Sequence, residues 1–288
     1  MSLHIISDRI AATPIRFETG RWKCDWRKVS RGVRGLLGLP ISRDAATLSN
    51  FLHTLRTNLA EELGRPITSI APAIFPLDKD KTQDFKDALE LAGLTSTRTL
   101  SGNSLVAHLD VNAAYAGLGY GLCKEWTDYQ NCTYEEVTFP YLDVLFLSFD
   151  NSSFTATVES LQNPYQEWPK YNFNLDLGWW DLPIHEVPRA RFWANIHEII
   201  VDTVSVLSRS PSRIVLMGAH GGDEEFRGVV EAALWSVLEM DVDLMLQANK
   251  AEDTTRLAAR GAAEMALRSQ YWSKNRGEWR VAGAPVEL

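Results

Sequence analysis

Apolar and alanine-rich positions recur with the spacing of amphipathic helices in several stretches of the chain. In the helix over residues 45–63, Leu48, Leu52 and Leu59 share one face, and Gly64 follows as a helix stop. The helix over 78–94 has Asp78 as its N-terminal cap. Further helices are predicted over residues 189–207, 224–238 and 254–271.

Short apolar or alternating runs between these helices predict strands. Two of them, 141–149 and 155–161, are separated by the turn sequence Asp-Asn-Ser-Ser and predict a β-hairpin. Residues 126–138 are polar and are predicted to form a loop, whereas the small residues of 111–122 predict a helix that allows close backbone packing. The remaining strands are expected at residues 67–75, 104–109, 213–217, 244–248 and 279–281. Helices and strands alternate, which indicates the α/β class with mixed sheets flanked by helices.

The charge and hydropathy of the chain bear on whether it binds nucleic acids or membranes. The chain has 288 residues and a formal net charge of −8, which disfavours binding to a nucleic-acid backbone. One basic stretch, 21–34, contains Trp22 and Trp26 among its cations, and a solvated face is favoured there over binding to single strands or acidic lipids. The sequence contains no 18-residue apolar run and no secretory leader, so we expect a cytoplasmic protein without membrane partners.

The three cysteines, Cys24, Cys123 and Cys132, are odd in number and lack a CxxC spacing. The pattern therefore predicts neither a disulfide framework nor a zinc site, and it favours a reducing compartment. We expect no bound metal.

Several segments, taken in order, resemble the nucleotide-binding domain of the seventy-kilodalton heat-shock chaperones. Residues 67–75 resemble the family strand V-x-x-V-P-A-x-F, and 81–94 resembles a helix that ends in A-G-L. Residues 112–122, with their final GYGL, are similar to the family's E-P-T-A-A-A-x-A-Y-G-L helix. Residues 214–218 followed by Gly221 resemble the adenosine loop V-L-V-G-G, and 256–263 resembles A-x-A-R-G-A-A.

The resemblance implies an actin-like ATPase fold with two lobes of ribonuclease-H-like topology and a reduced first lobe. It divides the chain into residues 1–44, an extension or remnant of the first lobe, 45–140, the first-lobe core, and 141–288, the second lobe. No segment corresponds to a peptide-binding domain, so we do not expect the chain to hold unfolded proteins.

The phosphate-binding elements implied by the resemblance are altered. Nothing in residues 1–64 matches the family's first phosphate loop, D-x-G-T-T. The second, D-x-G-G-G-T, falls on 148–153, where Ser148, Ser152 and Ser153 stand in place of the carboxylate and glycines. Asp150 lies two positions late and is interpreted either as a shifted metal-binding carboxylate or, preferably, as a turn residue.

The family's catalytic glutamate corresponds to Asn112, which cannot act as a base. Asp110 lies two residues earlier and would substitute only if the start of the helix has shifted.

Of the family's nucleotide-binding motifs, the adenosine loop is the one that this sequence matches best. Gly218, Gly221 and Gly222 predict a strand-to-helix turn whose N–H groups receive a ring or an anion. His220 and Asp223 add groups for acid–base chemistry. The alternatives are an exposed loop histidine and an acidic first helical turn that stabilises the helix dipole.

Two functions follow as hypotheses. The first is a pseudo-ATPase or regulatory binding protein that binds ATP or ADP weakly or not at all and has a protein partner. The second is an enzyme that uses the interlobe cleft for metal-independent chemistry on a small molecule, such as a biosynthetic cyclase, lyase or hydrolase. Its candidate acid–base groups are Asp110, Asp150, His220 and Asp223, with Trp179 and Trp180 as walls.

Overall fold

The computed structural model describes residues 42–97, 107–165, 172–207, 209–238, 242, 246 and 254–282. The basic stretch 21–34 lies outside the described residues. So does the strand expected at 244–248, except for Leu246, which is helical and buried. The strand expected at 104–109 is described only from residue 107 onward.

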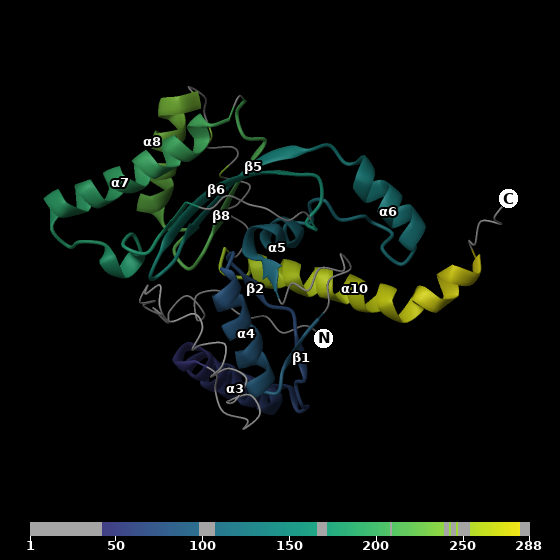
Figure 1. Ribbon diagram of the computed structural model, residues 1–288. Helices are drawn as coiled ribbons and strands as arrows, with labels where there is room; N and C mark the ends of the chain where they lie inside the picture. The colour runs from purple at the N-terminus through teal and green to yellow at the C-terminus, as the bar shows by residue number, and fades with distance from the viewer. Residues whose placement is uncertain are drawn as a thin grey trace.

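A four-stranded mixed sheet forms the centre of the molecule (Figure 1). Its strand order is β7-β6-β5-β8, with β5 antiparallel to β6 and parallel to β8. The predicted hairpin is confirmed, since Phe149 at the end of β5 pairs with Phe154 at the start of β6. The strands are β5 (Leu142–Phe149), β6 (Phe154–Leu161), β7 (Asn172–Asn174) and β8 (Arg213–Met217).

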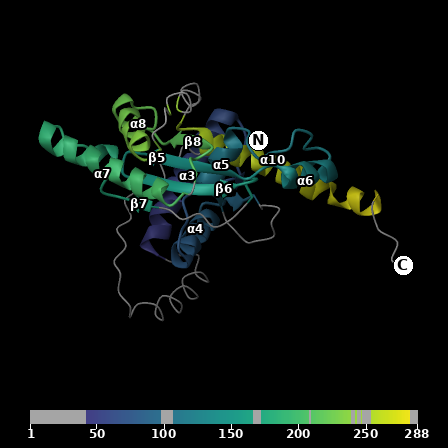
Figure 2. The same ribbon diagram turned by 90° about the horizontal axis from the view of Figure 1, so that it is seen from above.

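Helices cover both faces of this sheet (Figures 1 and 2). Side chains of β5 alternate between the faces, so Leu145 and Leu147 pack with one helix pair while Val144 and Phe146 pack with the other. The first pair is α7 (Glu186–Ser205) and α8 (Glu224–Leu238), and the second is α5 (Asp110–Gly117) and α10 (Leu257–Ala282). Burial on both faces explains why β5 is almost wholly apolar.

A smaller unit lies beside the α5–α10 face. It contains α3 (Arg43–Leu63) and α4 (Lys79–Leu91), whose apolar faces enclose a separate core that includes Leu52, Ile70 and Phe85. Two short parallel strand pairs complete the unit. These are β1 (Ser69–Ile70) with β3 (Thr95–Ser96), and β2 (Ala73–Ile74) with β4 (His108–Leu109).

The boundaries of this unit follow the predicted signals, with one difference. Asp78 caps α4 by accepting a hydrogen bond from Lys81 N, and Gly64 ends α3 in the left-handed conformation at φ 64°. The single strand expected over 67–75 is instead divided into β1 and β2 around Pro72. Proline has no N–H to donate to a strand ladder, while its carbonyl accepts the N–H of His108.

The helices α5 and α10 pack at close range through small residues. A Cβ on Gly117 would lie 3.1 Å from the carbonyl carbon of Leu257, and one on Gly261 would lie 2.5 Å from Gly117 N. Arg260 on α10 donates from Nε to Gly117 O at 2.7 Å and also contacts that oxygen through Nη2. The prediction of a small-residue helix that packs closely is confirmed, although α5 ends at Gly117 rather than at 122.

Two sequence-based expectations for segments that follow α5 were wrong. Residues predicted as a polar loop form α6 (Tyr129–Thr138), capped by Asp128, which accepts from Asn131 N at 3.1 Å. Its buried positions are Cys132 and Glu136, so the usual apolar periodicity is absent. The expected strand at 279–281 instead continues α10, because extending an existing helix requires no new nucleation.

Within the part of the chain that the structure describes, no helix is both long enough and apolar enough to cross a membrane.

His108 in β4 predicts acid lability of the folded state. Its side chain is buried, and desolvation lowers its pKa to about 4 from the usual 6.5 of histidine. The unfolded chain therefore binds the proton more readily, and stability falls as the pH drops from about 6.5 towards 4. We expect a loss on the order of 2–3 kcal/mol over that interval.

Urea unfolding at several pH values measures this loss. In His108→Phe, the acid-dependent part of the loss should be smaller than in the wild type, whatever the variant's stability at pH 7. An identical pH dependence in both proteins would exclude His108 as its source.

Candidate functional site

The turn between β5 and β6 and the loop between β8 and α8 meet at one end of the central sheet. The parallel pairing of β5 with β8 ends with Ser148 opposite Met217, so the segments that follow these two strands leave the sheet side by side. The hairpin turn comprises residues 150–153, and the glycine loop comprises residues 218–223. Hydrogen bonds join the two segments directly.

Gly218 permits the close approach of loop and turn. Its φ is +89°, a conformation that L side chains rarely adopt. A Cβ at this position would lie 2.5 Å from Phe149 O and 2.8 Å from Asp150 Oδ1. The next two N–H groups are donated to the same atoms: Ala219 N to Asp150 Oδ1 at 3.0 Å, and His220 N to Phe149 O at 2.9 Å.

Asp150 is almost completely buried, with 7% of its surface exposed. Besides accepting from Ala219 N, its carboxylate accepts from Ser148 Oγ at 2.9 Å. Its N–H donates to Ser153 O at 2.9 Å and closes the hairpin turn. Asp150 therefore acts as a turn residue whose carboxylate is held by two donors, in agreement with the favoured interpretation from the sequence.

The hairpin turn also holds the segment that leads into the 3-10 helix η1 (Trp179–Asp181). Trp179 N donates to Asp150 O and Trp180 N donates to Asn151 O, each at 2.9 Å. Gly178 packs against the backbone of Ser152, where an added Cβ would lie 2.5 Å from the Ser152 Cα. The turn is therefore fixed from two sides, by the glycine loop and by η1.

His220 lies half-buried between aromatic and polar neighbours. Its ring stacks on Trp179, with 4.1 Å between centroids and 6° between the planes. Its Nε2 is 2.9 Å from Asn151 Oδ1. Burial lowers the pKa of His220, and the nearby carboxylates of Asp223 and Asp150 oppose that effect. Burial therefore favours the neutral imidazole. Of the two interpretations left open by the sequence, that of a merely exposed loop histidine does not fit this half-buried, stacked ring.

Asp223 caps α8. Its Oδ1 accepts from Phe226 N at 3.0 Å, and its own N–H donates to His220 O at 3.0 Å. In the first turn of α8, Glu225 forms a salt bridge with Arg189 of α7. These contacts match the interpretation of the acidic run as stabilisation of a helix start.

The remaining loop glycines differ in their surroundings. Gly221 N donates to Gly218 O at 3.3 Å, and a Cβ on Gly221 would lie 2.8 Å from the carbonyl carbon of Met217. Gly222 is exposed, and nothing lies within 4 Å of where its Cβ would be. The N–H groups of residues 219, 220, 221 and 223 are therefore all donated within the protein.

The structure thus gathers most predicted site residues at the meeting of turn and loop: Ser148, Asp150, Ser152, Ser153, Gly218, His220, Gly221, Gly222 and Asp223. Asp110 belongs to another element, the first turn of α5, where its Oδ1 accepts from Val111 N at 2.9 Å. Asn112 is buried in the same helix and donates to Pro164 O at 3.2 Å.

Sequence reasoning missed Asn151 and the stacking role of Trp179. Asn151 was treated only as a turn residue, although its side chain contacts the histidine of a loop 69 positions later. Trp179 was named as a possible wall without a partner. The pairing of β5 with β8 is the signal that places the hairpin turn beside the glycine loop.

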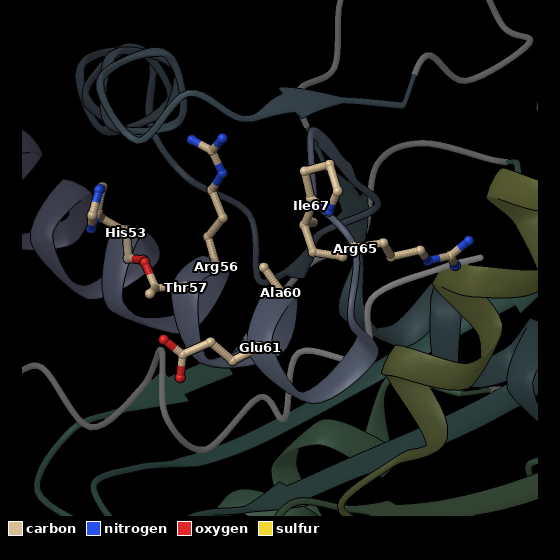
Figure 3. Close-up of a pocket in the computed structure, with 8 residues that line it drawn as sticks. His53, Arg56, Thr57, Ala60, Glu61, Arg65 and Ile67 are labelled. Carbon is tan, nitrogen blue, oxygen red and sulfur yellow. The ribbon is translucent and has the colours of Figure 1, made fainter.

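A shallow surface pocket of about 470 Å³ lies elsewhere, at the C-terminal half of α3 (Figure 3). Arg56, one of its cations, donates from Nη1 to Ala92 O at 2.8 Å and so supports the end of α4. None of the glycine-loop residues line this pocket, which is formed by His53, Arg56, Thr57, Ala60, Glu61, Arg65, Pro66 and Ile67.

The cysteine pattern predicted no disulfide framework, and this expectation was wrong. Cys123 and Cys132 form a disulfide whose Cα atoms are 5.1 Å apart. Folding brings them together because the chain turns back from the end of α5 into α6, an approach that sequence spacing does not reveal. With Glu136 they are the one group among the described residues with the geometry for a metal, but in this structure the two sulfur atoms are bonded to each other.

No protein-family model matches the chain, and no curated protein matches its sequence.

Proposed function

We propose that this chain is a degenerate relative of the actin-like ATPases that does not hydrolyse ATP and serves as a regulatory binding protein. The two lobes of that fold correspond to the unit around α3 and α4 and to the central sheet with its helices. The glycine loop is its remnant of an adenosine site, and the hairpin turn is its remnant of a phosphate site.

The topology of the central sheet supports the fold assignment. Three consecutive antiparallel strands, β5, β6 and β7, are followed by helix α7 and by β8, which returns beside β5 in parallel. This order is the one expected for a lobe of the ribonuclease-H-like type. The close packing of α5 on α10 through Gly117 and Gly261 joins segment 45–140 to segment 141–288 on one face of the central sheet.

The observation that carries the proposal is the direct closure of the turn onto the loop. ATP binding in this manner needs backbone N–H groups that point to a phosphate. Here the carboxylate of Asp150 accepts from Ala219 N, and Phe149 O accepts from His220 N. An ATP phosphate would have to displace these acceptors and approach a buried carboxylate. The residues present therefore do not fit a tightly bound phosphate.

Residues that would promote hydrolysis are also unsuited to it. Asn112, the counterpart of the catalytic glutamate, is neutral and donates to Pro164 O. Asp110 accepts from its neighbour's N–H at the helix start, and Asp150 is held by Ser148 and Ala219. Phosphoryl transfer relies on positioned charge and an aligned water. These contacts favour binding without turnover.

Replacing Asp150 tests whether its charge blocks the site. Asp150→Asn keeps an acceptor for Ala219 N and removes the negative charge. We expect calorimetry to show adenine-nucleotide affinity at least about tenfold higher than in the wild type, equivalent to about 1.4 kcal/mol. Asp176→Asn, an exposed residue of the β7–η1 segment, makes the same change in net charge and should have no effect. Equal affinities in all three proteins would contradict the proposal that adenine nucleotides bind where the hairpin turn meets the glycine loop.

A second candidate function rests on the state of His220. A neutral imidazole stacked on Trp179 beside Asn151 is suited to accept a proton from a small molecule at the mouth of the loop. Asp150 and Asp223 are committed to backbone donors and do not orient this ring through a hydrogen bond in the structure. His220 is therefore the one acid–base group that this alternative retains at the mouth.

Chemical modification tests this alternative. Diethyl pyrocarbonate ethoxycarbonylates accessible neutral imidazoles, and mass spectrometry of peptides from the treated full chain measures the rate at each histidine. If the mouth admits small molecules, His220 should react within about tenfold of the exposed His53 and His185, because its lowered pKa keeps it neutral. If His220 stays unmodified while His53 and His185 react, an acid–base role of His220 toward small molecules is excluded.

A further inference from the structure

A buried polar cluster lies far along the chain from the glycine loop, between α6 and α10. It contains the disulfide of Cys123 and Cys132, with Glu136 one turn after Cys132 on α6 and Arg268 on α10. Each of these four residues has no more than 7% of its surface exposed. Burying the charges of Glu136 and Arg268 costs free energy unless hydrogen bonds and opposite charges compensate for the lost water. The position of these two charged groups beside two sulfur atoms therefore calls for an explanation.

Each sulfur atom contacts a different charged group. Arg268 Nη1 lies 3.2 Å from Cys123 Sγ and donates to Cys123 O at 3.0 Å. Glu136 Oε1 lies 3.6 Å from Cys132 Sγ and accepts from Cys123 N at 3.3 Å. The charged groups are 4.0 Å apart, and Arg268 is also bound to Glu264.

These contacts match the reduced form better than the oxidised form. A disulfide sulfur carries neither charge nor proton, so it gains little from a guanidinium or a carboxylate. A thiolate on Cys123 would be stabilised by Arg268, and a thiol on Cys132 would donate its proton to Glu136. The protein therefore places a cation beside Cys123, which suits a thiolate, and a carboxylate beside Cys132, which suits a thiol.

We propose that Cys123 and Cys132 form a redox-active pair that interconverts between the disulfide and a reduced state with Cys123 as the thiolate. A dithiol reductant supplies the two electrons. Its thiolate attacks Cys132 Sγ, the S–S bond breaks, and Cys123 leaves as a thiolate beside Arg268. The second thiol of the reductant then attacks the mixed disulfide and becomes oxidised, and Cys132 leaves and takes up the proton that this thiol releases.

The pair is placed to affect how α6 is held. The disulfide closes a loop from residue 123 to residue 132, and Trp126 within it accepts through its carbonyl from Trp272 Nε1 of α10 at 2.6 Å. Lys124, Glu125 and residues 127–131 of the loop are exposed, so local opening gives a reductant access to the sulfurs. Reduction is expected to increase amide hydrogen exchange over residues 126–138.

Equilibration of the full chain in buffers of reduced and oxidised dithiothreitol tests the proposal. Thiols are trapped with N-ethylmaleimide and counted by mass spectrometry. We expect Cys123 and Cys132 to convert together in one two-electron transition. Arg268→Gln keeps a donor for Cys123 O but removes the charge, and it should shift the equilibrium about tenfold towards the disulfide, or about 30 mV.

Two further variants keep the test decisive. Arg260→Gln, another α10 arginine that donates to a backbone carbonyl, is the control and should leave the equilibrium unchanged. If Arg268→Gln does not fold, Glu136→Gln replaces it. Removing the negative charge of Glu136 should favour the Cys123 thiolate and shift the equilibrium in the opposite direction.

Equal redox equilibria in the wild type and the charge-altering variants would overturn the proposal, because a purely structural role destabilises both redox forms equally. A reduced protein that retains one equivalent of Zn²⁺, and loses it in Cys132→Ser, would overturn it in favour of a metal centre.

Discussion

Gly261→Ala is expected to destabilise the fold by about 4 kcal/mol or more, or to prevent folding. The added Cβ would overlap Ala113 O and lie 2.5 Å from Gly117 N, both of them backbone atoms of α5. Backbone atoms of a packed helix cannot move aside without separating α5 from α10. Far-UV circular dichroism during urea unfolding measures the change in the free energy of unfolding.

Gly228→Ala is the matched control for this substitution. Gly228 also lies within a helix, α8, but nothing is within 4 Å of where its Cβ would be. Alanine is the better helix former, so this change should stabilise the protein by up to about 1 kcal/mol. Similar effects from the two substitutions would show that α5 and α10 do not pack at the distance described.

Gly218→Ala is expected to cost about 3–4 kcal/mol, because two penalties act together. The residue has a φ of +89°, and an added Cβ would meet Phe149 O and Asp150 Oδ1. Either response, a change of backbone conformation or a shift of the hairpin turn, breaks the bond from Ala219 N to Asp150. Thermal unfolding monitored by tryptophan fluorescence should also report a changed environment of Trp179.

Gly222→Ala supplies the comparison within the same loop. Its backbone is not in the left-handed region and its Cβ would point into open space, so we expect a change within about 0.5 kcal/mol. If Gly218→Ala were tolerated as well as Gly222→Ala, the close contact between loop and turn would be refuted.

The parts of the fold that the sequence predicts well are those in which local pattern and tertiary position agree. The β5–β6 hairpin was predicted from an apolar run, an alternating run and a four-residue turn, and β8 and α8 were predicted with the bounds that the structure has. In each case the buried positions are apolar, so periodicity reports them.

The features that the sequence did not predict depend on contacts between distant residues. The buried face of α6 consists of Cys132 and Glu136, whose partners lie at residue 123 and on α10, so no apolar stripe marks this helix. Likewise, the stacking of His220 on Trp179 requires three segments to meet, at the hairpin turn, η1 and the glycine loop. Most residues of the candidate site that were named from the sequence therefore lie together in the structure, while their contacts are set by neighbours that no local pattern reveals.

Release of inorganic phosphate from Mg²⁺-ATP by the purified full chain distinguishes the proposed ATPase fold without hydrolysis from an active ATPase. Because Asp150 Oδ1 and Phe149 O accept the N–H groups of Ala219 and His220, we expect a rate no higher than that of buffer with Mg²⁺-ATP. Steady Mg²⁺-dependent turnover that is lost in Asp150→Asn and kept in Asp176→Asn would contradict it, since Asp150 would then be a catalytic carboxylate rather than the group that closes the site.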